Sequence, residues 1–177
     1  MTGPVVICYD GSAESADALA YAAALLPGAR AVVLTVWKPI VEEALSPATT
    51  PPVADPVEAN TSRQRAAAQV AADGARRASQ AGLDAEPLAI TATGPLWEAV
   101  ELVAEERDAR LIVCGTSRSG IKSTLPGNLA GALVDHAGHP VLVVPSAKAM
   151  AERRHDVHER RGRVGGTRVV SGPALRH

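Results

Sequence analysis

Short, uninterrupted apolar runs alternate with segments of helical periodicity along most of the chain. The runs cover residues 5–9, 31–36, 87–91, 111–114 and 140–144, and the third is the weakest. A strand made only of apolar residues must be covered on both faces, and regular alternation of strands with helices places such strands in one parallel sheet. The sequence therefore predicts an α/β fold: a doubly wound, five-stranded parallel sheet with helices on both faces.

The segments between these runs carry helix start and stop signals. Ser12 is a good N-cap for a first helix, which Pro27-Gly28 would end. A second, alanine-rich helix is expected over residues 57–81 and a fourth over about 128–137. The third opens at Gly94-Pro95, and its apolar stripe consists of Leu96, Ala99, Val100, Val103 and Ala104. Its expected solvated face consists of Glu98, Glu101, Glu105 and Glu106.

The order of the strands in the sheet predicts where a ligand would bind. Right-handed crossovers leave few topologies, and a common order is 3-2-1-4-5. In this order the sheet reverses direction between its first and fourth strands, and ligands bind at the carboxyl ends of the strands at that point. The segments that follow these two strands are Asp10-Gly11-Ser12 and the stretch that begins at Gly115. We therefore expect both segments to line one crevice.

The stretch from Gly115 to Asn128, GTSRSGIKSTLPGN, has the chemistry of a phosphate-binding loop. Backbone N–H groups of a glycine-punctuated loop between a buried strand and a helix can point at an anion. Arg118 and Lys122 would add positive charge, and Gly120 and Gly127 would add backbone freedom. The alternative is an ordinary solvent-exposed loop, because glycine-rich loops are common.

The sequence divides into an acidic part and a short basic part. Residues 1–145 carry 10 Lys and Arg against 16 Asp and Glu, a net charge of −6, whereas residues 146–177 carry 8 against 3, a net charge of +5. The five prolines of residues 39–56 predict an irregular loop within the first part. Residues 146–177 lack sustained apolar periodicity, so we expect a basic, disordered tail with at most a short surface helix over residues 147–159. The tail has no aromatic residue to stack on bases, so nucleic-acid binding is not expected.

Several function classes find no support in the sequence. Cys8 and Cys114 each lie within an apolar run, where a small buried side chain is expected rather than a redox pair. No apolar run is long enough to span a membrane and the N-terminus lacks a basic leader segment, which predicts a cytoplasmic protein. No arrangement of a nucleophile with a base and no metal-ligand cluster is evident, so no catalytic or metal-binding residue is predicted. His136 and His139 are interpreted as charges or caps at the end of the fourth helix.

Three segments, taken in order, resemble the universal stress protein family. They are VVICYDGSAESADALAYAAAL near the start, TGPLWEAVELVAEERDARLIVCGT in the middle, and GNLAGALVDHAGHPVLVVP at the end of the acidic part. The similarity extends over residues 5–145 and leaves only the proline-rich loop unmatched in detail. It implies the same five-stranded fold, a homodimer formed along the last strand and, in some members, bound ATP or a related adenine nucleotide.

The resemblance also implies roles for individual residues. In the members that bind nucleotide, the aspartate that ends the first strand lies beside adenosine, and this residue is Asp10 here. The end of the second strand contacts the base through its backbone, and this residue is Val36 here. The phosphates lie on a loop of the pattern G-x2-G-x9-G-[S/T]. The candidate nucleotide-binding residues are Asp10, Val36, Gly115, Thr116, Arg118, Gly120, Gly127 and Asn128.

The phosphate loop departs from that pattern. Gly115 and Gly127 match its first and last glycines, but Arg118 stands where the second glycine is expected and Asn128 where Ser or Thr is expected. Eleven residues separate Gly115 from Gly127, one fewer than the pattern requires. The loop is therefore either a variant phosphate site, in which Gly120 and Arg118 compensate, or a site that has lost ATP.

The sequence thus predicts a non-catalytic regulatory protein of the stress response that resembles universal stress proteins and binds ATP or another adenine nucleotide. Mg²⁺ would accompany the phosphates of a bound nucleotide. The alternative is a nucleotide-free interaction protein on the same fold, acting through its dimer face or its basic tail. Slow ATP hydrolysis is a weaker alternative, because the sequence shows no positioned general base.

Overall fold

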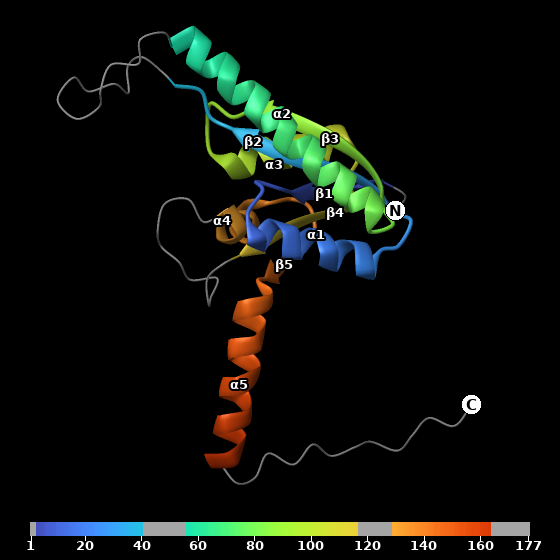
Figure 1. Cartoon of the computed structure of the whole chain (residues 1–177), viewed down its shortest axis with the longest axis vertical. Coiled ribbons are helices and arrows are strands. Elements are labelled where there is room, and N and C mark those ends of the chain that lie inside the picture. Colours follow the sequence, from blue (N-terminus) through green and yellow to red (C-terminus); the bar gives the residue numbers. More distant parts are fainter. Residues whose placement is uncertain (1–2, 41–55, 117–128, 164–177) are drawn as a thin grey trace, which may run out of the picture.

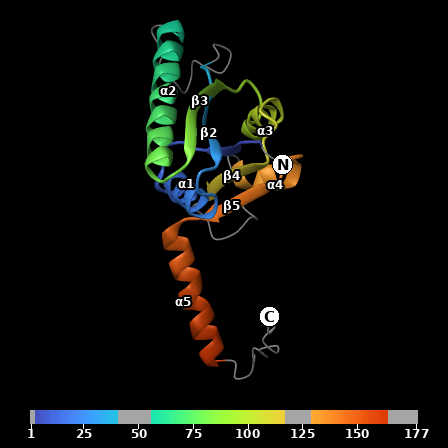
Figure 2. The same cartoon turned by 90° about the vertical axis from the view of Figure 1, so that its right-hand side faces the viewer.

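The computed structural model of the chain describes residues 3–40, 56–116 and 129–163. The strands of these residues form one parallel sheet with helices on both faces (Figures 1 and 2). The strands are β1 (Val5–Cys8), β2 (Arg30–Trp37), β3 (Asp84–Thr91), β4 (Leu111–Thr116) and β5 (Val141–Pro145). The helices are α1 (Ala13–Leu25), α2 (Pro56–Gln80), α3 (Leu96–Glu106), α4 (Leu129–His136) and α5 (Ala147–Arg163).

The strand order is β3-β2-β1-β4-β5, and neighbouring strands are parallel. β1 lies at the centre, where Val5 is in register with Ala31 of β2 and with Leu111 of β4. The carboxyl ends of β1, β2 and β4 therefore point the same way, and the segments that follow them emerge at one edge of the sheet. The predicted doubly wound sheet is confirmed.

Two apolar clusters cover the two faces of the sheet. On one face, α1 and α2 pack against Val5, Ile7 and Val33, mainly through alanines. On the other face, α3 and α4 pack around Val6 and Ile112. Successive side chains of a strand point to opposite faces, so Val5 and Ile7 belong to one cluster and Val6 to the other. The apolar runs of β1, β2 and β4 thus have the double burial that they predicted, whereas most residues of the edge strands β3 and β5 are exposed or only partly buried.

The third strand begins earlier than the sequence suggested. β3 starts at Asp84, three residues before the predicted start at Pro87. Proline cannot donate a hydrogen bond to a neighbouring strand, and this made the preceding residues look unlike a strand. β3 is at the edge of the sheet and pairs only with β2, so one of its sides needs no such donor.

The apolar stripe of α3 faces the sheet, since Val100, Val103 and Ala104 are buried. The expected solvated face is wrong at one position, because the Glu101 side chain is only 21% exposed. Its Oε1 accepts a hydrogen bond from the N–H of Gly138 at 3.0 Å and lies 2.6 Å from Nδ1 of His139. The turn after α4 packs against α3, and this contact removes Glu101 from solvent. His139 is thus the partner of Glu101 as well as a residue near the end of α4.

The residues after β5 form a longer helix than the sequence suggested. α5 runs from Ala147 to Arg163, whereas only residues 147–159 were expected to form a helix in an otherwise disordered tail. Alanine, arginine and glutamate are good helix formers, but α5 lacks the apolar stripe by which helices were recognised in the sequence. α5 projects away from the sheet (Figures 1 and 2). Residues 164–177 and 41–55 lie outside the described residues, so the extent of the tail and the proline-rich loop stay predictions.

Both cysteines are free, and each lies in the sheet. Cys114 is buried and Cys8 is partly buried. Burial raises the pKa of the Cys114 thiol to about 12, and burial together with the neighbouring Cys114 and Asp10 raises the pKa of Cys8 well above its ordinary value. Both thiols are therefore protonated at neutral pH and act as small packing residues, in agreement with the sequence analysis.

Candidate functional site

Three segments of the chain meet at the end of the sheet where the parallel strands have their carboxyl ends. β1 ends first, at Cys8, which is in register with Leu34 of β2. β2 continues for three further residues, to Trp37, and β4 continues to Thr116. β2 and β4 flank β1 in the sheet, so their ends stand on either side of the point where β1 leaves it. We call the residues at this point, Asp10, Ser12, Val36, Gly115 and Thr116, the switch-point site.

The Asp10 carboxylate is held by the turn that leads into α1. Its Oδ1 accepts hydrogen bonds from the N–H of Ser12 at 2.9 Å and from Oγ of Ser12 at 2.6 Å. Gly11 allows this tight turn because its φ of 81° is in the left-handed region, which glycine adopts without strain. Oγ of Ser12 in turn accepts a hydrogen bond from the N–H of Ser15 at 3.2 Å, so the predicted N-cap of α1 is confirmed. The orientation of Asp10 is therefore fixed by the same turn that starts α1.

Asp10 is exposed, and its hydrogen bonds favour the charged form. Partial desolvation raises the pKa of the Asp10 carboxyl, but the hydrogen bonds from Ser12, with smaller contributions from Ser15 and the backbone, outweigh it and hold this pKa below its ordinary 3.8. A carboxylate accepts hydrogen bonds and cannot donate them. Asp10 is therefore suited to bind a ligand through hydroxyl or amine donors.

β2 presents backbone polar groups of Val36 where β1 has ended. The carbonyl of Leu34 accepts a hydrogen bond from the N–H of Tyr9 at 2.8 Å, so the polar groups of Leu34 point toward β1. These groups point to the same side in alternate residues of a strand, so those of Val36 point there too. The carbonyl of Tyr9 accepts a hydrogen bond from Oγ1 of Thr35 at 2.7 Å, and no described residue pairs with the backbone of Val36 on this side. The N–H and the C=O of Val36 are thus left to pair with a ligand. Such a ligand would present a hydrogen-bond acceptor beside a donor.

Gly115 lies where the end of β4 passes the first turn of α1. A Cβ atom added to Gly115 would clash with the backbone carbonyl of Glu14 and crowd the backbone nitrogen of Ser15. Any side chain would push β4 away from α1, because neither neighbour is a flexible side-chain end. The first glycine of the predicted phosphate loop therefore has a packing role in addition to any role in binding.

Thr116 is the last described residue before residue 129. It is in register with Pro145 of β5, and its carbonyl accepts a hydrogen bond from the N–H of Ser146 at 3.1 Å. The other predicted residues of the phosphate loop lie outside the described residues. These are Arg118, Gly120, Gly127 and Asn128, and their role in binding stays a prediction.

Two hydroxyl residues that the sequence analysis did not single out shape the site. Ser15 is buried, and its Oγ donates to the carbonyl of Ser12 at 3.0 Å and accepts from the N–H of Asp10 at 3.4 Å. Thr35 is also buried and holds the Tyr9 carbonyl. The signal for Ser15 was its place three residues after the N-cap Ser12. The signal for Thr35 was a lone hydroxyl residue within an apolar run. Both residues position the chain around Asp10 and Val36.

Within the described ranges, no three or more His, Cys, Asp and Glu side chains gather into a set that could hold a metal ion. None of the helices in the same ranges is both long and apolar enough to cross a membrane. The expected cytoplasmic location stays a prediction. The switch-point site is where the residues with ligand-binding chemistry come together.

Comparisons of the sequence and of the structure with known proteins point to the same family. The sequence model of the universal stress protein family matches residues 1–145. A protein of this family from Burkholderia pseudomallei has 25% sequence identity and a TM-score of 0.60, and the match covers 81% of this chain and 96% of that one. A universal stress protein in complex with cAMP has 22% identity and a TM-score of 0.56, covering 83% and 100%. One from Archaeoglobus fulgidus in complex with dAMP has 17% identity and a TM-score of 0.52, covering 81% and 99%. No curated protein sequence matches the chain significantly.

The hydrogen bonds to Asp10 predict a stability that falls in acid. The pKa of Asp10 is lowered in the folded protein, so its stabilising effect is complete above the ordinary value of 3.8 and is lost as the pH falls through the folded value. In Asp10→Asn the amide oxygen still accepts the bonds from Ser12 but does not titrate. Between about pH 5 and about pH 3, the free energy of unfolding of Asp10→Asn should therefore change less than that of the wild type.

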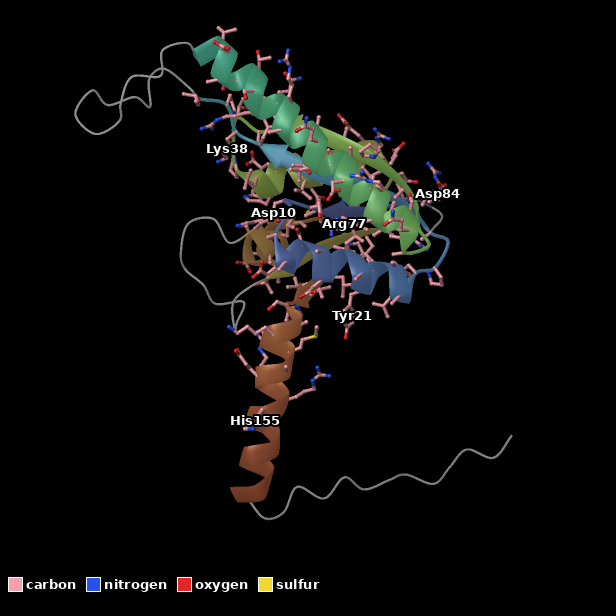
Figure 3. All side chains as sticks on the ribbon, viewed as in Figure 1. Asp10, Tyr21, Lys38, Arg77, Asp84 and His155 are labelled. Atoms are coloured by element: carbon pink, nitrogen blue, oxygen red, sulfur yellow. The ribbon has the colours of Figure 1, made fainter. Side chains whose placement is uncertain are left out.

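Urea unfolding followed by circular dichroism at several pH values measures this difference. The control is Asp84→Asn, which removes an exposed carboxylate at the start of β3, at the opposite end of the sheet from Asp10 (Figure 3). The same pH dependence in the wild type and in Asp10→Asn would contradict the prediction.

Proposed function

The chain belongs to the universal stress protein family, and from this premise we propose that it is a non-catalytic regulatory protein that binds an adenine nucleotide, ATP or a close relative, at the switch-point site. One observation carries the proposal. The N–H and C=O of Val36 face the point where β1 leaves the sheet, which is also where the oriented carboxylate of Asp10 lies.

The two ends of adenosine match these two groups. An adenine edge presents an amine donor beside a ring-nitrogen acceptor, which complements a backbone C=O beside an N–H. The ribose hydroxyls are donors, and an acidic residue at the end of a strand in a doubly wound sheet is a known type of partner for them. In this proposal Val36 binds the base and Asp10 binds the ribose. The side chain of Val36 packs into the core, so the contact uses its backbone.

The phosphates would lie beyond the end of β4. Gly115 and Thr116 begin this segment next to the first turn of α1, whose helix dipole favours an anion. Arg118 would supply positive charge, and Gly120, Gly127 and Asn128 would supply backbone and amide donors. Mg²⁺ would accompany the phosphates of a bound nucleotide and supply positive charge there.

The related structures support an adenine nucleotide as the ligand. One universal stress protein of similar fold was solved with cAMP and another with dAMP. Both ligands contain adenine and a ribose or deoxyribose, the parts assigned here to Val36 and Asp10. The phosphate groups of cAMP and dAMP differ, so adenine and the sugar are the parts that the two ligands share. This agrees with a site that recognises mainly these parts.

The proposal predicts that the full-length protein binds ATP, ADP, AMP or cAMP with one nucleotide per chain. Asp10→Asn should weaken binding of the preferred nucleotide by about tenfold or more, because a hydrogen bond to a charged group is worth about 1.5 kcal/mol or more. Asp84→Asn should leave the affinity unchanged. Isothermal titration calorimetry measures all three proteins.

Two results would contradict the proposal. Failure to bind any of the four nucleotides would favour the alternative, a nucleotide-free interaction protein that acts through its dimer face or its basic tail. Steady conversion of ATP to ADP by the wild-type protein, absent in Asp10→Ala, would show that the site is catalytic.

We also propose that two chains form a homodimer along β5. This strand is at the edge of the sheet and pairs only with β4 within the described chain. Its residues Val141, Leu142 and Val143 are each partly exposed although they are apolar. A strand from a second copy would pair with the outer backbone groups and cover these side chains.

A single substitution distinguishes the two sides of β5. The N–H of Ser146 and the carbonyl of Pro140 pair with β4, so the polar groups of Val143 point to the outer edge. Val143→Pro removes an outward N–H while sparing the bonds to β4. Sedimentation equilibrium should give the mass of two chains for the wild type and of one chain for Val143→Pro, with the circular dichroism spectrum retained. A monomeric wild type would contradict the proposal, as would a dimeric Val143→Pro.

A further inference from the structure

α5 begins at the switch-point site, directly after the residues that the family model matches. The N–H of Ser146 donates to the carbonyl of Thr116 at 3.1 Å. The N–H of Ala147 donates to Oδ2 of Asp17, in α1, at 2.7 Å. The first N–H groups of a helix have no partner within the helix, so the start of α5 depends on acceptors elsewhere. Here β4 and α1, the two elements that meet at Gly115, supply them.

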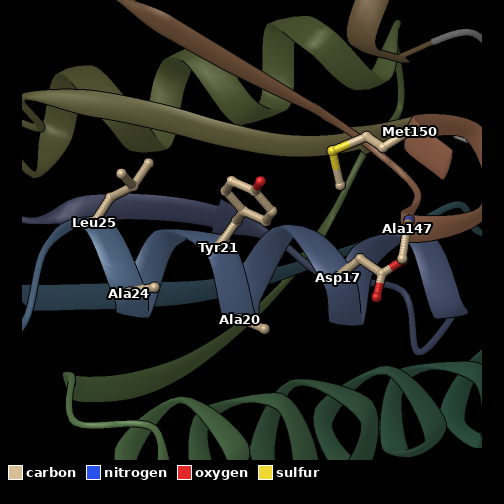
Figure 4. Close-up of a pocket in the computed structure, with 7 residues that line it drawn as sticks. All are labelled: Asp17, Ala20, Tyr21, Ala24, Leu25, Ala147 and Met150. Atoms are coloured by element: carbon tan, nitrogen blue, oxygen red, sulfur yellow. The ribbon is translucent and has the colours of Figure 1, made fainter. Parts of the chain in front are cut away.

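The anchored part of α5 is short. Ser146 and Ala149 are buried, and Oγ of Ser146 caps the helix by accepting a hydrogen bond from the N–H of Ala149 at 3.2 Å. Met150 lines a small apolar groove of about 240 Å³ between α1 and α5, together with Tyr21 and Leu25 (Figure 4). The next residues, 151–155, are exposed, and the helix extends away from the sheet (Figure 2).

The anchor is therefore important for the whole of α5. Most of the stability of a helix in a protein comes from packing of an apolar face, and α5 is rich in charged residues and lacks an apolar stripe. The carboxylate of Asp17 supports α5 twice, because it accepts the first N–H and places a negative charge at the positive end of the helix dipole. Loss of these contacts would release the start of α5 from β4 and α1.

We infer that the switch-point site controls α5: a nucleotide bound there stabilises the anchored state of α5. This inference rests on the proposed function. A ligand beside Gly115 and the first turn of α1 would restrict the motion of both segments that carry the acceptors for α5, Thr116 and Asp17. If the ligand already restricts Thr116 and Asp17, less conformational entropy is lost when they accept the two hydrogen bonds from Ser146 and Ala147. The start of α5 therefore detaches from β4 and α1 less often. By linkage, weakening the anchor must weaken nucleotide binding.

The consequence is a nucleotide-dependent surface outside the matched domain. Lys148, Arg153 and Arg154 lie on α5, whereas residues 1–145 have a net charge of −6. Anchoring sets the position of these positive charges relative to the acidic domain. The nucleotide would in this way change what the protein presents to its surroundings without any catalytic step.

Hydrogen–deuterium exchange of the full-length protein, read by mass spectrometry with and without saturating ATP, tests the inference. The amides of α5 should exchange about fivefold more slowly, or slower still, when ATP is bound, which is the lower end of typical coupling between sites. The amides of residues 100–106 of α3 serve as the internal control, because Val100, Val103 and Ala104 anchor this helix on the face of the sheet opposite α1.

Two variants test whether the coupling passes through the anchor. Asp17→Asn keeps an oxygen acceptor but loses the charge, and Asp17→Ala loses both. The ATP-dependent protection of α5 should decrease from the wild type to Asp17→Asn to Asp17→Ala, and the affinity for ATP should decrease in the same order. Asp84→Asn, the matched control, should behave as the wild type. If circular dichroism shows that Asp17→Ala does not fold, the comparison of Asp17→Asn with Asp84→Asn carries the test.

The outcomes separate this inference from the proposed function. Binding of ATP with unchanged exchange in α5 would overturn the inference and leave the proposed function standing. Full protection of α5 by ATP in a folded Asp17 variant would also overturn it. Failure of the wild type to bind ATP would overturn the inference, and failure to bind ATP, ADP, AMP and cAMP alike would overturn both.

Discussion

The contact between the first turn of α1 and the end of β4 is the interaction on which the site depends. Gly115 has no side chain, so the backbone of β4 can pass the carbonyl of Glu14 at close range. The same turn of α1 holds the Asp10 carboxylate through Ser12. The first two turns of α1 thus set the position of the acidic group, of the strand end from which the phosphate loop leaves and, through Asp17, of the start of α5.

A second constraint is the unequal length of the central strands. β1 stops at Cys8 while β2 continues past Leu34, and this leaves backbone groups of Val36 without a partner in the described chain. Such groups are costly unless water or a ligand satisfies them. The adenosine end of the proposed site is therefore built from described residues and does not depend on the unusual spacing of the phosphate loop. A variant phosphate loop is therefore compatible with the proposed binding of an adenine nucleotide.

The sequence predicted the sheet, its strand order and the buried face of α3, because apolar runs and an apolar helical stripe are local signals. It did not predict contacts that need tertiary structure. Glu101 has the sequence context of an exposed helix residue, and only the turn at Gly138 and His139 removes it from solvent. The extent of α5 was missed because its stability comes from helix-forming residues and an anchor at one end. The candidate site was predicted at Asp10, Val36 and Gly115, whereas the roles of Ser15 and Thr35 depend on distances that no spacing reveals.

The most direct test of the account is to locate the bound nucleotide by NMR. Adding ATP to the isotope-labelled full-length protein should shift the backbone amide signals of Asp10, Ser12, Val36 and Gly115 more than those elsewhere in the sheet. This result would show that a nucleotide binds where β1 leaves the sheet. Shifts concentrated in the groove at Tyr21 and Leu25 of α1 without shifts at Asp10, Val36 and Gly115, or no shifts at all, would contradict the account.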